Sequence, residues 1–436
     1  MGVDAMRQGA RTSSRVARSR SRSSEGFRAT VSSRCRSGTV SPLTTVGALG
    51  EIPPSKRYPA GRSVPRRAGR AAPPGRPWSQ ERPGATRGGA VQRLVVLADG
   101  TWKSDEDASD RTNVEKLRDL VVQDDGGVLQ DCRYLEGVGT RGGLDRWLGG
   151  AVGAGLSGKV LEGYRWLVER YRPDDQVFLL GFSRGAYTVR SLAGLVRNLG
   201  ILRPEHAGRV DEAYAHYRDR DERWAPEGDL ARRFRQAYAH PLPRIAFLGV
   251  WDTVGALGVP GGGPLAWWTR RRYGFHDVQL SGIVDRAYQA LAIDERRGTF
   301  APTLWTVDPA HAGHQVVRQT WFTGSHSDVG GGCPDSGLSD ITLRWMAQGA
   351  AEAGLGLDTG RLPRDDRYDA PLHDSARALF RVLSLRDRAI GPAGSADVHR
   401  AARDRHERGV RPPYAPRNLL AWLQAQRGAG SRVPTA

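Results

Sequence analysis

Hydrophobic and polar positions after residue 90 follow two alternating periods. A continuous apolar run at Leu94–Ala98 ends in Asp99-Gly100, which predicts a short buried strand followed by a turn. Residues Thr112–Val122 then repeat apolar side chains every three or four positions, the spacing of one helix face. The same succession continues along the chain. We expect further strands near Cys132–Leu135, Gln176–Leu180, Ile245–Trp251 and Val316–Phe322, and helices near Leu156–Tyr171, Arg184–Asn198 and Leu338–Ala353.

Strands that alternate with helices predict an α/β fold, in which a mostly parallel sheet carries helices on both faces. In such sheets, catalytic groups collect at the carboxyl ends of the strands. Polar helical stretches are expected near Asp211–His240. After residue 360 the patterning weakens, and we expect short helices at Ala376–Leu383 and Asn418–Gln426 with a loosely ordered end. We therefore predict a catalytic domain at 91–360 and a C-terminal extension at 361–436.

Residues 1–90 carry +14 of the chain's formal net charge of +18 and lack sustained apolar periodicity. Such a segment cannot bury enough surface to offset its ordering entropy, so we expect a disordered basic tail. A basic tail binds nucleic acid or anionic lipid by charge alone. However, 61 of the 65 basic residues are arginine, a bias typical of codon composition. We favour an inert leader over a functional arm or a transit peptide, and expect no specific nucleic-acid partner.

Membrane, secretion and metal signals are weak in this sequence. No stretch approaches the about 20 apolar residues of a membrane span, and no apolar core follows the N-terminal arginines as a secretory signal requires. We therefore expect a cytoplasmic protein made in soluble form, with non-classical export left open. Cys35, Cys132 and Cys333 are odd in number and lack metal-ligand spacing. The sequence thus predicts no disulfide framework, no metal site and no cofactor.

Ser183 lies in Gly181-Phe182-Ser183-Arg184-Gly185, between a predicted strand and a predicted helix. In that context G-x-S-x-G is typical of a nucleophile elbow, whose strained turn needs glycine on both sides of the serine. The N–H of Arg184 and the helix N-terminus would then stabilise an oxyanion. The alternative is a glycine-rich turn with an incidental serine. A phosphate-binding turn is disfavoured, because the lysine of a P-loop is missing here.

A serine nucleophile needs a histidine base and a carboxylate that orients it, in the chain order serine, acid, histidine. Asp252 directly follows the run Ile245–Trp251, and His326 follows Val316–Phe322. They are therefore the candidate acid and base. The alternatives are a turn residue for Asp252 and a loop histidine for His326. The reserve acids are Asp328, Asp294 and Asp277.

The first strand ends in Asp99-Gly100-Thr101-Trp102, where a hydrolase of this architecture supplies a second oxyanion N–H. Gly100 and Thr101 are the candidates for it, and Asp99 is equally explained as a brace of the loop. The segment Gly137–Gly142 matches G-x-G-x-x-G, but no helix opens there as a dinucleotide site requires. We expect a flexible loop near the active-site mouth instead.

Six segments, in the same order, resemble the α/β-hydrolase family that includes the type VI secretion phospholipase effectors, many of whose members are catalogued as a domain of unknown function. The resemblance covers roughly residues 92–355. It rests on Asp99-Gly100-Thr101-Trp102 with Thr112-Asn113-Val114, Gly137-Val138-Gly139-Thr140, Gly181–Tyr187, Val250–Gly255, Ala290–Arg296 and His326–Gly332.

The resemblance implies a triad of Ser183, Asp252 and His326 that hydrolyses carboxylic esters, with phospholipid acyl chains as the substrates of the characterised effectors. Those effectors bear sizeable membrane-engaging regions, for which this chain has little room. Trp267-Trp268 with Arg270–Arg272 fits either peripheral membrane contact or a lid over the pocket.

The predicted function is a metal-independent serine esterase or phospholipase that acts through an acyl-enzyme on an ester or phospholipid substrate. The alternative is a non-catalytic protein that keeps the hydrolase fold to bind lipid or a partner. A third hypothesis, nucleic-acid binding through residues 1–90, would show steep salt dependence. Acyl-chain specificity, head-group specificity and oligomeric state are not predicted.

Overall fold

The computed structural model describes residues 91–100, 110–137, 151–254, 279–374, 385–391 and 397–430. Several expectations therefore lie outside the described residues. These are the basic tail, Thr101, most of the glycine loop after Gly137, the segment Trp267–Arg272, Asp277 and the helix expected at Ala376–Leu383.

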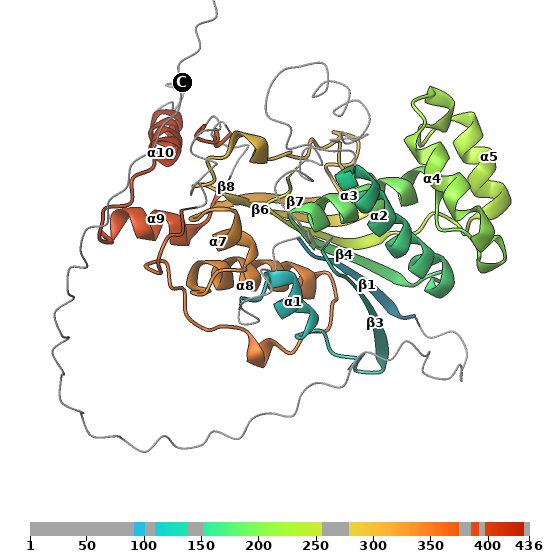
Figure 1. Cartoon of the computed structure of the whole chain (residues 1–436), viewed down its shortest axis with the longest axis horizontal. Coiled ribbons are helices and arrows are strands. Elements are labelled where there is room, and N and C mark those ends of the chain that lie inside the picture. Colours follow the sequence, from blue (N-terminus) through green and yellow to red (C-terminus); the bar gives the residue numbers. More distant parts are fainter. Residues whose placement is uncertain are drawn as a thin grey trace, which may run out of the picture. The chain divides into compact units, whose positions relative to one another are not determined.

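An eight-stranded sheet forms the centre of the described chain, with strand order β2-β3-β1-β4-β5-β6-β7-β8 (Figure 1). Every neighbouring pair in it is parallel except β2 with β3. The mostly parallel sheet is as the sequence predicted. The strands are β1 (Arg93–Ala98), β2 (Asp124–Asp125), β3 (Val128–Leu135), β4 (Gln176–Phe182), β5 (Ile245–Trp251), β6 (Val284–Ala292), β7 (Val316–Phe322) and β8 (Asp397–Val398).

Helices cover both faces of this sheet, which confirms the predicted α/β class (Figure 1). One face carries α2 (Ala151–Arg170), α3 (Arg184–Leu199), α4 (Val210–Arg218) and α5 (Asp229–Tyr238), and the other carries α1 (Asn113–Arg118), α7 (His326–Gly330) and α8 (Gly337–Glu352). Beyond them lie α9 (Arg400–Glu407) and α10 (Arg417–Gly430). Short 3₁₀ turns are η2 (Pro204–Arg209), η3 (Glu222–Trp224), η4 (Gly298–Phe300) and η5 (Thr359–Arg361).

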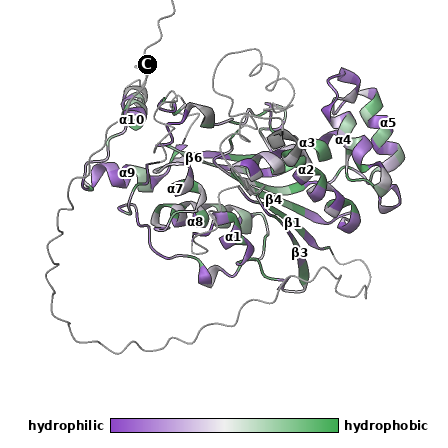
Figure 2. Cartoon of the chain, viewed as in Figure 1, coloured by the Kyte–Doolittle hydropathy of each residue, from purple (hydrophilic) through white to green (hydrophobic). Residues whose placement is uncertain are grey.

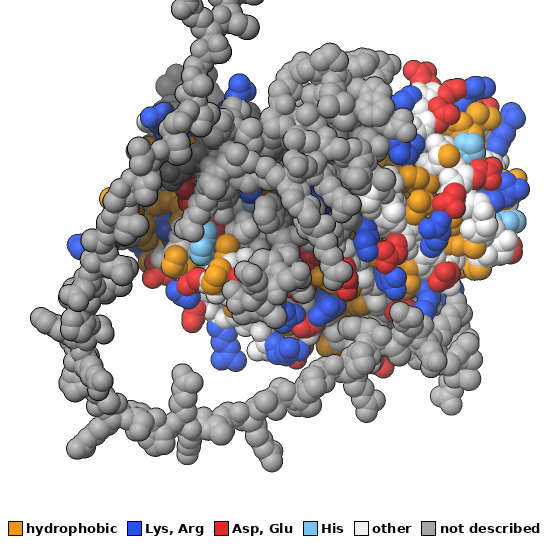
Figure 3. Space-filling model, in the orientation of Figure 1, with side chains coloured by type: hydrophobic (Ala, Val, Ile, Leu, Met, Phe, Trp, Pro, Cys, Tyr) orange, Lys and Arg blue, Asp and Glu red, His pale blue; other side chains and the backbone are white. Residues whose placement is uncertain are grey.

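The continuous apolar strands form because their side chains are buried on both faces of the sheet. In β1, Leu94 and Val96 pack toward the α2 and α3 layer, while Val95 and Leu97 pack toward α1 and α8. The central strands are accordingly hydrophobic in Figure 2, whereas α9 is largely hydrophilic. On the face shown in Figure 3, basic and acidic side chains of the described residues lie interspersed.

The C-terminal residues add to the sheet rather than lying apart from it. Strand β8 pairs in parallel with β7 through Val398 and Trp321. Trp422 and Leu419 of α10 pack in the same apolar cluster as Trp321 and Leu291. The helix expected at Asn418–Gln426 is therefore confirmed within α10. This packing brings residues 385–391 close to the ends of β5 and β6.

Two differences from the expected elements concern the site. Strand β6 was not predicted, since polar residues such as Asp285, Arg286 and Gln289 interrupt its apolar pattern. His326, expected in a loop, is the first residue of the short helix α7. Among the described residues, no helix is both long enough and apolar enough to cross a bilayer.

Candidate active site

Ser183 occupies a sharp turn between β4 and α3. Its backbone has φ 57° and ψ −118°, in the region that residues other than glycine rarely adopt. Such a conformation costs about 1–3 kcal/mol and persists only where the surroundings enforce it. The N–H of Ser183 donates to the carbonyl oxygen of Trp251 at 3.1 Å, which ties the turn to the end of β5. The predicted strand, tight turn and helix are thus present.

The two glycines beside the serine allow this turn to pack. A Cβ at Gly181 would lie 2.5 Å from the carbonyl oxygen of Gly185 at the start of α3. A Cβ at Gly185 would lie only 2.0 Å from the carbonyl oxygen of Ala98 in β1. Both positions therefore exclude any side chain, for the steric reason that the sequence motif indicated.

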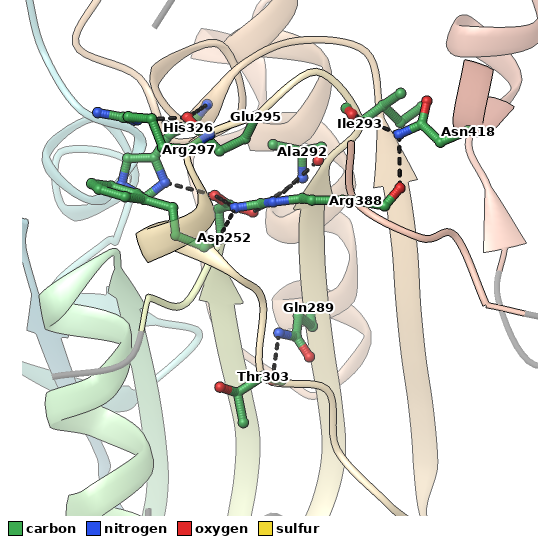
Figure 4. Close-up of polar contacts among 11 residues, drawn as sticks. Asp252, Gln289, Ala292, Ile293, Glu295, Arg297, Thr303, His326, Arg388 and Asn418 are labelled. Carbon is green, nitrogen blue, oxygen red and sulfur yellow. Dashed lines mark hydrogen bonds and ion pairs between the residues drawn. The ribbon is translucent and has the colours of Figure 1, made fainter. Parts of the chain in front are cut away.

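Asp252 and His326 meet at the carboxyl ends of β5 and β7 (Figure 4). His326 Nδ1 and Asp252 Oδ2 are 2.6 Å apart. Both residues are almost completely buried: the exposed fraction is 1% for His326 and 0% for Asp252. If Nδ1 carries the proton that Asp252 accepts, the other ring nitrogen, Nε2, is an acceptor. Nε2 has no hydrogen-bond partner among the described residues, so the Ser183 hydroxyl does not bond to it in this structure, although a base must come within hydrogen-bond reach of the proton that it takes.

The elbow and this acid–base pair share one edge of the sheet. The ring of Phe182, the residue before the serine, packs on the imidazole of His326 with centroids 4.6 Å apart. Helix α7 approaches closely enough that a Cβ at Gly330 would lie 2.0 Å from the Phe182 ring. The hydrogen bond of Ser183 to Trp251 places the serine one residue from Asp252. The three residues singled out from the sequence are therefore neighbours.

Arg388 is a further residue of the site that the sequence analysis missed. Its guanidinium binds Asp252 through both oxygens, with Nη1 2.6 Å from Oδ1 and Nη2 3.0 Å from Oδ2 (Figure 4). It also donates to the carbonyl oxygens of Ala292 at 3.1 Å and Phe300 at 2.5 Å. Nothing in the local sequence distinguishes Arg388 from the nearby Arg386, so only the tertiary structure identifies it.

The surroundings favour an ionised Asp252 and a neutral His326. Burial alone would raise the pKa of Asp252, but Arg388 and His326 outweigh it and hold that pKa below its ordinary value. Burial lowers the pKa of His326, although the hydrogen bond to Asp252 opposes this effect. A neutral imidazole at pH 7 is the form that accepts a proton.

A second buried ion pair lies beside the histidine. Arg297 donates to both oxygens of Glu295, at 2.9 Å and 2.7 Å, and the guanidinium stacks 3.7 Å from the centre of the Phe300 ring. Glu295 also accepts a long hydrogen bond of 3.4 Å from the backbone N–H of His326. Burial favours the neutral acid, yet Arg297 holds the pKa of Glu295 below its ordinary value. This pair fixes the start of α7 and the Phe300 ring at the imidazole edge.

The oxyanion candidates have different surroundings. Arg184 is the first residue of α3, at the helix end where N–H groups point outward. Gly100 lies beside Ser183, since its Cβ position would be 3.1 Å from the serine Cβ. In this structure the N–H of Gly100 donates to Oδ1 of Asp99 at 2.6 Å. Thr101 is outside the described residues.

Asp99 binds two hydroxyl groups from neighbouring elements. Its Oδ2 accepts hydrogen bonds from the hydroxyls of Thr112 at 2.5 Å and Tyr134 at 2.7 Å. Burial raises the pKa of this carboxyl. The same Thr112 caps α1 in a capping box with Glu115. Asp99 therefore joins the ends of β1 and β3 to the start of α1.

The reserve acids bind other groups. Asp294 accepts hydrogen bonds from the N–H of Gly324 at 2.7 Å and the hydroxyl of Tyr414 at 2.8 Å. Asp328 accepts from Ser325 and lies 2.6 Å from Nδ1 of His373. Asp252 is thus the carboxylate that binds the imidazole of His326.

A known protein family matches the part of the chain that contains Ser183, Asp252 and His326. The family described as "T6SS, Phospholipase effector Tle1-like, catalytic domain" matches residues 92–349. An uncharacterized protein of Saccharomyces cerevisiae is 26% identical over an alignment of 242 residues, and the match covers 50% of this chain and 33% of the yeast protein. The chain therefore spans about a third of the length of that curated relative.

Two solved structures are also similar to parts of the chain. The Tle1 effector bound to the VgrG spike from the Type 6 secretion system is 16% identical with a TM-score of 0.37, over 66% of this chain and 77% of that one. An uncharacterized protein from Pseudomonas aeruginosa is 19% identical with a TM-score of 0.35, over 62% and 46%. Because the family match covers more than half of this chain's residues, the chain belongs to the Tle1-like family of type VI secretion phospholipase effector catalytic domains.

Proposed function

We propose that the chain is a serine hydrolase that cleaves a carboxylic ester bond of phospholipids through an acyl-enzyme on Ser183. The observation that carries the proposal is the buried hydrogen bond between Asp252 and His326, with Nε2 of His326 unpartnered among the described residues, beside a strained serine turn. Family membership supports a lipid ester as substrate. Acyl transfer by a serine, a histidine and a carboxylate uses this carboxylate–imidazole hydrogen bond, and it also needs the Ser183 hydroxyl to come within hydrogen-bond reach of Nε2.

In the proposed reaction, Nε2 of His326 takes the proton of the Ser183 hydroxyl as its oxygen attacks the ester carbonyl carbon. The carbonyl oxygen becomes negative and is stabilised by the N–H of Arg184 and that of Gly100 or Thr101. When the tetrahedral intermediate collapses, His326 gives the proton to the departing alcohol. Water then attacks the acyl-enzyme by the reverse steps and releases a fatty acid.

Asp252 and Arg388 act on the histidine rather than on the substrate in this proposal. Asp252 keeps the proton of the neutral imidazole on Nδ1 and stabilises the imidazolium that forms. Arg388 is a positioning residue, because its two hydrogen bonds fix the plane of the Asp252 carboxylate. The Gly100 N–H must turn from Asp99 before it can serve the oxyanion.

A fluorophosphonate probe tests the nucleophile. The wild type should be labelled covalently, and Ser183→Ala should not. Ser157→Ala is the matched control, since Ser157 lies on α2 and hydrogen-bonds Tyr214. Equal labelling of wild type and Ser183→Ala would overturn the assignment.

Mass spectrometry of a mixed phospholipid extract tests the substrate. The proposal expects free fatty acid together with lysophospholipid, absent with Ser183→Ala. Probe labelling without phospholipid turnover, but with turnover of short nitrophenyl esters, would restrict the function to a general esterase. Saturable lipid binding without hydrolysis of any ester would favour the non-catalytic alternative.

A further inference from the structure

Three potential metal ligands converge behind α7, outside the proposed catalytic residues. They are Asp328 in α7, Cys333 in the loop that follows it, and His373 in the described segment 371–374. One ligand atom from each lies within 4.8 Å of the other two. Tetrahedral zinc sites hold their ligands about 3.3–3.8 Å apart, as metal–ligand distances of about 2.0–2.3 Å require. A shift of about 1 Å therefore suffices to close these three groups on one ion.

Asp328 is held in a fixed orientation, as a metal-binding carboxylate usually is. Its Oδ2 accepts hydrogen bonds from the N–H and the hydroxyl of Ser325, at 2.9 Å and 3.0 Å, and from the N–H of His373 at 3.1 Å. Its Oδ1 lies 2.6 Å from Nδ1 of His373. One oxygen is thus fixed by three donors, and the other faces the imidazole.

The surroundings of Cys333 favour a cation. The carboxylates of Asp328, Asp110 and Asp335 all act on its thiol. The same negative charge attracts a divalent ion, whose binding replaces the thiol proton. Arg367 offsets part of this negative charge, because its guanidinium lies 3.4 Å from a carboxylate oxygen of Asp335. Cys333 and His373 are half-buried, so an ion can reach them from solvent.

We propose that Asp328, Cys333 and His373 bind one zinc ion, with water as the fourth ligand. A thiolate and an imidazole select zinc or cobalt over calcium or magnesium. The ion releases the thiol proton of Cys333 and inserts between Asp328 and a neutral His373 protonated on Nε2. The ion would tie the helix that begins with His326 to the segment 371–374. The sequence did not indicate it, because His373 lies 45 positions from Asp328.

Cobalt titration of the full-length chain, without a polyhistidine tag and after removal of metal with a chelator, tests the site. One equivalent of Co²⁺ should give the visible bands of a tetrahedral site and a near-ultraviolet thiolate-to-cobalt band, and Zn²⁺ should abolish both. Cys333→Ser should lose the thiolate band, and His373→Gln should weaken binding at least about tenfold. The controls Cys132→Ala and His314→Gln should bind as the wild type does. Absence of stoichiometric binding, or an unchanged thiolate band in Cys333→Ser, would overturn the proposal.

A second measurement needs no variant and applies even if a variant fails to fold. Zn²⁺ should slow alkylation of Cys333 in the wild type, measured by peptide mass spectrometry, and leave that of Cys132 unchanged. Zn²⁺ should also raise the midpoint of thermal unfolding, because an ion that binds the folded state stabilises it. Equal alkylation of Cys333 with and without Zn²⁺ would show that the three groups only hydrogen-bond one another. Neither measurement depends on Ser183, so the outcome is independent of the proposed hydrolase.

Discussion

The serine turn and the carboxylate of Asp252 are held in different ways. The turn is local: β4, Ser183 and α3 are consecutive, and two glycines within a five-residue motif allow their packing. The carboxylate depends on distant parts of the chain, because His326 lies 74 positions and Arg388 136 positions away. A motif can encode the first arrangement, whereas only the assembled sheet creates the second. The two halves of the site should therefore respond differently to mutation.

The largest expected effect is on turnover when the proposed base is removed. His326→Ala should lower esterase turnover about 10,000-fold, or about 5.5 kcal/mol in the barrier, since the serine then lacks its proton acceptor. Kinetics on a short nitrophenyl ester measure this loss. His399→Ala serves as the comparison, because His399 lies before α9 and packs on Phe322. If His326→Ala keeps most of its turnover, another group is the base.

Arg388→Met tests the long-range half of the site. It leaves the Asp252 carboxylate buried without its cation, so the free energy of unfolding should fall by about 3–5 kcal/mol. Urea denaturation measures the change. Arg386→Met is the matched control, because the side chain of Arg386 is exposed and should alter stability by less than about 0.5 kcal/mol.

A paired substitution sharpens the same test. Adding Asp252→Asn to Arg388→Met removes the unpaired charge and should restore part of the stability, but not the activity. If the double variant loses as much stability as the sum of the two single losses, or more, the guanidinium does not act through Asp252.

Gly185→Ala tests the local half of the site. Its methyl group would meet the carbonyl oxygen of Ala98, so α3 or β1 must move at a cost of about 1–3 kcal/mol. Thermal unfolding measures this cost. Gly158→Ala on α2 has open space around its Cβ position and should instead stabilise by about 0.5–1 kcal/mol. If Gly185→Ala leaves the midpoint of thermal unfolding unchanged, the turn is looser than the contact distance implies.

The smallest expected effect is on the loss of stability in acid, which should change gradually with pH when Asp252 is replaced. The folded-state pKa of Asp252 lies below its ordinary value of 3.8, so its ion pairs stabilise the fold above that value. This contribution is lost as the pH falls from about 4 through the lower folded-state pKa. Asp252→Asn should therefore show a shallower loss of stability over that range in acid titration followed by circular dichroism. An unchanged slope would mean that other carboxylates dominate.

The same contrast explains what the sequence could predict. Apolar runs identified β1, β4 and β5, whose side chains are buried on both faces of the sheet. Strand β7 could be found from its apolar ends, although Arg318 and Gln319 lie within it. Ser183, Asp252 and His326 could be singled out because each directly follows, or lies close behind, such a run. Strand β6 could not be found, as its polar residues are satisfied by partners elsewhere in the fold. Gln289, for example, donates to the carbonyl oxygen of Thr303.

Sequence patterns could not identify Arg388 or His373, for a related reason. Each lies in a segment without hydrophobic periodicity, and each acquires its partner only through packing of the C-terminal residues on β6, β7 and α7. The residues next to one arginine among several, or next to one histidine in a loop, do not indicate that its side chain makes a buried contact.

The distance between Asp252 and Arg388 along the chain also sets an order of events during synthesis. A ribosome adds about 5–20 residues per second, so the 136 positions between them take about 7 to 27 seconds. Throughout that interval the aspartate is already part of the chain, whereas its arginine does not yet exist. Its site cannot close as a buried ion pair until residues 385–391 follow. The nascent chain thus holds a finished serine turn well before it holds a finished acid and base.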